Sequence, residues 1–88
     1  MFHIGKLTLK NRLILAPMAG ITNLPFRRIA KKMGVSLVTS EMVSAVGLAR
    51  GGGKTFTYLR SVPEERPLAV QIFGADPRIM AEAAQIVV

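Results

Sequence analysis

Gln71 is the residue whose type and setting point most directly to chemistry. It is the single polar residue in the apolar run at residues 68–73. A buried amide left without hydrogen-bond partners costs about 1–3 kcal/mol, so this side chain needs a partner. Because an amide both donates and accepts, Gln71 suits the polar edge of a planar heterocycle such as a pyrimidine. A structural hydrogen bond to a neighbouring strand or loop is the alternative interpretation.

A second candidate group follows the apolar run at residues 13–16, which breaks abruptly at Pro17-Met18-Ala19. Proline cannot donate to a central ladder, so we expect the strand to end there. The polarizable side chain of Met18 can lie against an aromatic ring, or it can fill a core. Gly20 allows the backbone to approach a ligand closely, or it makes a turn. Glu41 is either a buried carboxylate near the same site or the partner of a neighbouring loop.

An alternation of short strands and helices must position these residues. A hairpin is expected at residues 2–9, around Gly5-Lys6. Periodicity then predicts strands at residues 13–16, 35–39 and 68–73, and helices at residues 24–33, 45–49 and 77–88. This α/β order is typical of a doubly wound sheet or a barrel. Both folds place their sites at the carboxyl ends of strands, and Pro17-Met18-Ala19, Ser40-Glu41-Met42 and Gln71 fall there.

The boundaries of the helices carry their own signals. Thr22 or Asn23 can cap the first helix and Gly34 can end it, while Asp76 can cap the last helix with Pro77 at its first position. The first helix is expected to bury an apolar side and to expose a basic one: Leu24, Phe26, Ile29, Ala30 and Met33 against Arg27, Arg28, Lys31 and Lys32. The last helix is expected to bury a side made of Ile79, Met80, Ala83, Ala84 and Val87.

The glycine-rich stretch Gly51-Gly52-Gly53-Lys54-Thr55 lacks the spacing of a phosphate-binding loop and does not follow a strand, so it is interpreted as a flexible connection. Residues 54–62 are left unassigned, and residues 63–67 are predicted to form a turn.

Composition limits the partners. Twelve basic and five acidic residues give a net charge of +7, which favours an anionic partner, with nucleic acid or phosphates first. The basic residues are dispersed, so an ordinary basic surface remains the alternative. The chain has no cysteine, and its one histidine, His3, lies at the extreme N-terminus, so no metal site is predicted. No membrane span and no signal peptide are predicted, which favours a cytoplasmic protein.

The length also bears on the fold. A (β/α)₈ barrel typically needs roughly 250 residues, and this chain has 88. It ends inside an apparent helix at Gln85-Ile86-Val87-Val88. We therefore expect residues 1–88 to be the N-terminal portion of a larger domain.

Three blocks in order resemble the tRNA-dihydrouridine synthase family, most closely its bacterial B-type. Residues 15–27 resemble the first motif of that family, and Ser40-Glu41-Met42-Val43-Ser44-Ala45 resembles the second. Residues 63–67, then Val70-Gln71-Ile72-Phe73-Gly74 and Asp76-Pro77, resemble the third. Asn23 stands where an aspartate is common in the family, which keeps the capping role. The glycines at residues 51–53 replace a more varied loop.

The resemblance implies a flavin-binding (β/α)₈ TIM barrel, incomplete in this chain, with Pro17, Met18 and Ala19 lining the FMN ring and Gln71 at its polar edge. It implies that reduced FMN gives hydride to a uracil carbon of tRNA, that a cysteine supplies the proton, and that NADPH recharges the flavin. The cysteine and the groups that hold the flavin phosphate are expected beyond residue 88, so no catalytic residue is assigned within the chain.

Two other hypotheses stay open at the level of the sequence. One is another FMN-dependent barrel oxidoreductase, such as a dihydroorotate dehydrogenase or an ene-reductase, which also carries flavin-lining residues after its first strand. The other is a small, non-catalytic, basic RNA-binding protein, which would explain the charge and the length. It would not explain a glutamine in an apolar strand.

Overall fold

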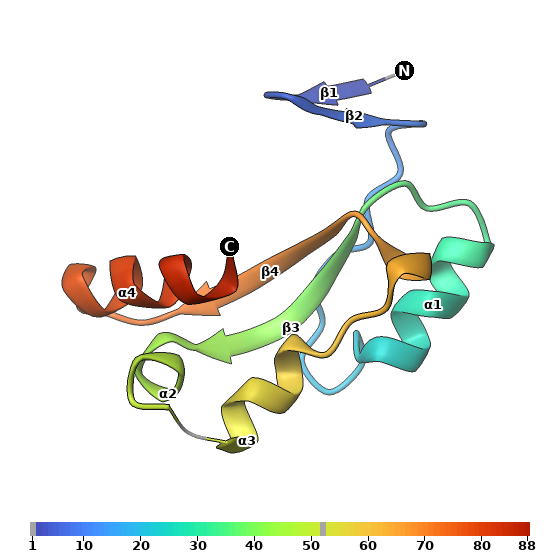
Figure 1. Cartoon of the computed structure of the whole chain (residues 1–88). Helices are drawn as coiled ribbons and strands as arrows, with labels where there is room; N and C mark the ends of the chain where they lie inside the picture. Colours follow the sequence, from blue (N-terminus) through green and yellow to red (C-terminus); the bar gives the residue numbers. More distant parts are fainter. Residues whose placement is uncertain (1, 52) are drawn as a thin grey trace.

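The structure, a computed structural model, describes residues 2–51 and 53–88. Figure 1 shows a small hairpin set apart from a two-stranded sheet that is flanked by helices. The elements are β1 (Phe2–Ile4), β2 (Leu7–Leu9), α1 (Leu24–Lys32), β3 (Val38–Ser44), α2 (Ala45–Ala49), α3 (Gly53–Phe56), the 3₁₀ turns η1 (Thr57–Leu59) and η2 (Pro63–Glu65), β4 (Leu68–Phe73) and α4 (Pro77–Val87). The predicted mixed α/β class is confirmed.

The strands form two separate pairs. β1 and β2 are antiparallel and turn at Gly5, which has a φ of +56°, so the predicted hairpin is confirmed. β3 and β4 are parallel, from the pair Val38–Leu68 to the pair Ser44–Phe73. Within the described residues these strands do not close a barrel.

The prediction for β4 is confirmed at both ends, whereas the prediction for β3 is wrong at both ends. β3 begins at Val38 and runs on to Ser44, because β4 offers a pairing partner along that whole length. An irregularity between Thr39 and Met42 lets the strand continue through its polar residues. Ser40-Glu41-Met42 therefore lies inside the strand instead of at its end.

Residues 13–16 were expected to form a strand, and that is wrong for the described structure, which has only one bridge there. One parallel bridge joins Ile14 to Leu37, supported by hydrogen bonds from Leu15 N to Leu37 O at 2.9 Å and from Ser36 N to Leu13 O at 3.0 Å. Leu13 is 59% exposed and Ile14 is 45% exposed. The segment is extended, but among the described residues it pairs on one side only, against Leu37, the residue just before β3.

α1 begins at the predicted cap, but the residues that it buries and exposes differ from those predicted. Asn23 Oδ1 accepts from Phe26 N at 3.1 Å, and Met33 is already the C-cap. Arg27, expected on the solvent side, is 2% exposed, whereas Ile29 and Met33, expected in the core, are 62% and 81% exposed. The reason is a buried acidic partner for Arg27, described below.

The core lies on one face of the β3–β4 pair, under α2 and α4. Val43, Ala45, Leu48 and Ala83 are its buried centre, and Val70, Ile72, Ile79, Met80 and Val87 pack around them. The predicted cap of α4 is confirmed, since Asp76 Oδ1 accepts from Arg78 N at 2.9 Å. Ser44 caps α2 in the same way, and its Oγ accepts from Gly47 N at 3.1 Å. The buried side predicted for the last helix is confirmed at the four of its positions that pack in this core, Ile79, Met80, Ala83 and Val87.

The middle of the chain is helical where the sequence left it open. Residues 53–59 form α3 and η1, and the predicted turn at residues 63–67 begins with η2. Gly51 has a φ of +72° and Gly53 starts α3, while Gly52 lies outside the described residues. Gly34 has a φ of +109° just after α1, as expected for a residue that ends a helix.

The open edges of the β3–β4 pair predict self-association of the 88-residue chain. Helices cover one face of this pair, but they do not satisfy the hydrogen-bonding groups along an unpaired edge strand. We expect oligomers that grow with concentration in sedimentation velocity experiments, together with weakly cooperative thermal unfolding. A concentration-independent monomer with a sharp melting transition would contradict this prediction.

Candidate functional site

Residues 17–22 form a tight, internally bonded loop that presents Met18. The carbonyl of Met18 accepts from Ile21 N at 3.0 Å and from Thr22 N at 2.9 Å. The hydroxyl of Thr22 accepts from Met18 N at 3.0 Å and donates to Met18 O at 3.1 Å. Thr22 is fully buried and holds this loop instead of capping α1. The backbone of Met18 is thus fixed while its side chain, like Pro17 and Ala19, stays exposed.

Glu41 ties this loop to the sheet. Its Oε1 atom accepts from the backbone N–H of Gly20 at 2.6 Å, a short charge-assisted hydrogen bond. Gly20 has a φ of +75°, a conformation that glycine adopts without steric cost. Of the two interpretations of Glu41 that the sequence allowed, the structure shows the pairing with a neighbouring loop, and that loop is the candidate ligand loop.

Gln71 lies in the second half of β4. Its backbone N–H donates to the hydroxyl of Ser40 on β3 at 3.0 Å. Its side-chain Oε1 is buried and has no hydrogen-bond partner among the described residues. Met42 is its partner in the register of the sheet, and paired residues project to the same face. The amide that sequence reasoning singled out is therefore an open hydrogen-bond acceptor.

A buried ion pair holds the end of the loop at residues 17–22. Arg27 and Glu65 form a salt bridge, and Arg27 Nη2 also donates to Glu65 Oε2 at 3.2 Å. The same guanidinium donates to Thr22 O and to Arg60 O, each at 2.9 Å. One side chain thus connects α1, the end of the Met18 loop and the segment before β4.

Sequence reasoning missed Arg27, Glu65, Thr22 and Ser40 as supporting residues. Arg27 sits four residues after the helix cap, where a basic residue is ordinarily solvated, and its partner lies 38 residues further along the chain. No local pattern links the two. Ser40 carried a weak signal, because it is a small polar residue inside what proved to be a buried stretch of strand.

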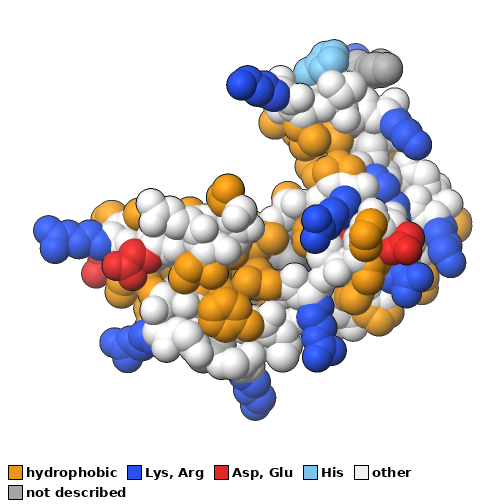
Figure 2. Space-filling model, in the orientation of Figure 1, with side chains coloured by type: hydrophobic (Ala, Val, Ile, Leu, Met, Phe, Trp, Pro, Cys, Tyr) orange, Lys and Arg blue, Asp and Glu red, His pale blue; other side chains and the backbone are white. Residues whose placement is uncertain are grey.

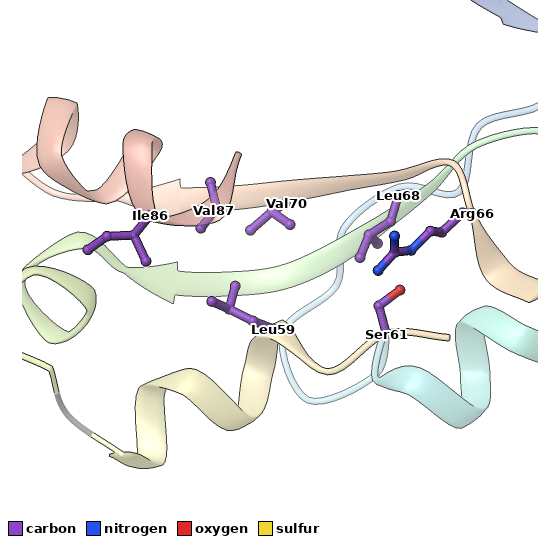
Figure 3. Close-up of a pocket in the computed structure, with 7 residues that line it drawn as sticks. All are labelled: Leu59, Ser61, Arg66, Leu68, Val70, Ile86 and Val87. Carbon is purple, nitrogen blue, oxygen red and sulfur yellow. The ribbon is translucent and has the colours of Figure 1, made fainter. Parts of the chain in front are cut away.

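A cavity of about 280 Å³ lies on the other face of β4 and is not this site (Figure 3). Val70 points into it, and side chains alternate along a strand, so Gln71 points away from it. Figure 3 shows Arg66 and Ser61 at one end and Ile86 and Val87 of α4 at the other. This cavity belongs to the layer between the sheet and its covering helices.

The charge of the chain is spread over its surface. Figure 2 shows Lys and Arg side chains scattered over the visible face, with few acidic ones between them. Partial burial lowers the pKa of Lys31, and the charge of nearby Lys10 lowers it further. Within residues 2–51 and 53–88, no three potential ligands cluster to hold a metal ion. No described helix is long and apolar enough to cross a membrane.

The family is decided by comparison with known sequences. Residues 14–88 match the family model "Dihydrouridine synthase (Dus)". The chain belongs to the dihydrouridine synthase family. This confirms the family predicted from the three sequence blocks, and it disfavours the two alternatives that the sequence left open.

Individual relatives agree with this family. The chain is 48% identical over 83 residues to the tRNA-dihydrouridine synthase B of Pseudomonas aeruginosa. The aligned residues make up 94% of this chain and 25% of that protein. It is 45% identical over 84 residues to the protein of that name from Escherichia coli (strain K12), covering 96% of this chain and 26% of that protein. For the Salmonella typhimurium protein the identity is 46% over 84 residues. The chain spans about a quarter of the length of these relatives.

Proposed function

We propose that this chain forms the first β/α units of an FMN-binding (β/α)₈ barrel. The complete enzyme would reduce uridine in tRNA to 5,6-dihydrouridine with NADPH as the reductant. The observation that carries the cofactor proposal is the buried Oε1 of Gln71, which has no hydrogen-bond partner within residues 2–51 and 53–88. A buried acceptor without a donor is costly, so its partner is expected to come from a ligand.

The residues present fit the isoalloxazine ring of FMN. The pyrimidine part of that ring carries an N–H that Gln71 Oε1 can accept from. Met18 offers a polarizable surface for an aromatic system, and its neighbours Pro17 and Ala19 are exposed as well. FMN, when bound, supplies the hydride that the uracil ring accepts.

The proton donor that the reaction also needs is proposed to lie outside these 88 residues. Reduction of the uracil double bond needs a proton donor on the second carbon, and a cysteine is proposed for that role. The 88 residues contain none. Their part is to hold and orient the ring through Gln71, Met18 and the loop that Glu41 anchors, and to contribute positive charge toward tRNA.

Replacing Gln71 tests the cofactor role. We define the hybrid enzyme as the Pseudomonas aeruginosa relative in which this chain replaces the matching segment. In it, Gln71→Ala is expected to raise the dissociation constant of FMN about 5–30-fold, because the loss of one hydrogen bond costs roughly 1–2 kcal/mol. Fluorescence titration of the apo-hybrid with FMN measures this constant.

A second glutamine provides the matched control for this experiment. Gln85 is exposed on α4, so Gln85→Ala should leave the affinity for FMN unchanged. Equal affinities for both variants would contradict the role of Gln71, and a folded, unsubstituted hybrid that holds no FMN would contradict the proposed function itself.

A further inference from the structure

An irregularity in β3 sits between the two halves of the candidate site. Thr39 pairs with Ala69 and Met42 pairs with Gln71, so two residues on β3, Ser40 and Glu41, stand against a single residue on β4. This is the arrangement of a β-bulge, which is uncommon between parallel strands and re-aims the side chains that it carries.

β3 lies between the two halves of the site. Leu37, the residue just before β3, bridges to Ile14 on one side, and β3 itself pairs with β4 on the other side. Figure 1 shows β3 running beside β4, with the light-blue chain that precedes α1 passing along its other side. A residue in the middle of β3 can therefore reach both neighbours.

Ser40 reaches toward β4. Its fully buried hydroxyl accepts from Gln71 N at 3.0 Å and donates to Glu41 O at 2.9 Å. The hydroxyl thus gives Gln71 N–H an acceptor at the point where the bulge interrupts the ladder. Both hydrogen-bonding roles of Ser40 are used, and the backbone of the strand that carries the open amide is fixed.

Glu41 reaches in the opposite direction. Its carboxylate accepts from Gly20 N at 2.6 Å, two residues beyond Met18. An ionised acceptor makes a stronger hydrogen bond than a neutral one, and Gly20 belongs to the exposed loop that presents Pro17-Met18-Ala19. Among residues 2–51 and 53–88, no other side-chain hydrogen bond links the bulge to this loop.

We propose that the Ser40–Glu41 bulge is the positioning element of the FMN site, in which Ser40 sets Gln71 and Glu41 sets the Met18 loop. Neither side chain needs to touch the ring. Each acts through the residue that it holds, so both are positioning residues. This inference rests on the proposed function. It holds that two adjacent residues, Ser40 and Glu41, set the distance between Gln71 and the Met18 loop.

The test uses a pair of substitutions at Glu41 that match in size. Glu41→Gln keeps an oxygen that accepts from Gly20 N, whereas Glu41→Leu removes every acceptor. In the hybrid enzyme we expect Glu41→Leu to raise the dissociation constant of FMN about tenfold and Glu41→Gln to raise it by less than about threefold. Glu82→Gln, at an exposed position on α4, is the control for charge alone and should leave the affinity unchanged.

A second readout separates positioning from general damage and does not depend on flavin. In the apo-hybrid, hydrogen exchange at the Gly20 amide should become faster in Glu41→Leu than in Glu41→Gln, while the amides of α4 should keep their protection. Ser40→Ala should speed exchange at the Gln71 amide and leave Gly20 unaffected.

The two readouts distinguish failure of the hydrogen bond, of the positioning role and of FMN binding itself. Faster exchange at Gly20 in Glu41→Leu, with unchanged affinity for FMN, would confirm the hydrogen bond but overturn the positioning proposal. Equal exchange and equal affinity in Glu41→Leu and Glu41→Gln would overturn both the hydrogen bond and the proposal. Failure of the folded, unsubstituted hybrid to bind FMN would overturn the proposed function, whatever the exchange data show.

Discussion

Glu65→Ala is expected to unfold much of the 88-residue chain in water. Glu65 is fully buried, and its removal leaves the buried guanidinium of Arg27 without its counter-charge. Breaking one side of a buried ion pair typically costs about 3–5 kcal/mol. A small domain has only about 5–15 kcal/mol in total, so at the lower end of that range this loss removes most of the stability. Urea unfolding followed by far-UV circular dichroism, at concentrations where the chain is monomeric, measures the effect.

Two controls make this prediction specific. Glu64 is the exposed neighbour of Glu65 in the same 3₁₀ turn, so Glu64→Ala should change the free energy of unfolding by less than about 0.5 kcal/mol. The double variant Arg27→Met with Glu65→Leu replaces both charges with apolar groups, which can be neutral when packing is kept. Here it should restore stability only in part, since Thr22 O and Arg60 O lose their donor. Equal stability of Glu65→Ala and Glu64→Ala would contradict the role of the ion pair.

The local elements of the fold could be predicted because their causes are local. The apolar run at residues 68–73 ends at Gly74 and forms β4, and Asp76 followed by Pro77 starts α4. In both cases the residues that decide the structure are adjacent in sequence. The need of the Gln71 amide for a partner could also be predicted from its apolar neighbours, and no described residue makes a hydrogen bond to its Oε1.

The wrong predictions share a different cause. The burial of Arg27 depends on Glu65, and the length of β3 depends on pairing with β4. The exposure of Leu13 and Ile14 reflects pairing on one side only among the described residues. In each case the deciding partner lies far along the chain, so side-chain periodicity alone gives no information about it. The bulge at Ser40 and Glu41 is of the same kind, because a register shift exists only relative to a second strand.

The largest expected effect concerns catalysis by the 88-residue chain alone. We expect no formation of dihydrouridine above background when this chain is incubated with FMN, NADPH and unmodified tRNA. The chain contains no cysteine to serve as the proposed proton donor, and its described strands leave the sheet open. An open site admits water, which weakens the electrostatic interactions on which a dry active site depends.

The hybrid enzyme provides the matched comparison, since it contains the same 88 residues together with the rest of the Pseudomonas aeruginosa relative. It should form dihydrouridine from the same mixture, and its Gln71→Ala variant should lose activity in proportion to bound FMN. Liquid chromatography with mass spectrometry of nucleosides from digested tRNA detects the added mass of two hydrogens. Turnover by the 88-residue chain alone would contradict the assignment of the proton donor to a residue outside it. An inactive hybrid that nevertheless binds FMN would show that these residues hold the cofactor without orienting it for reduction of uridine, and the bulge at Ser40 and Glu41 would then be the first place to compare with the relative.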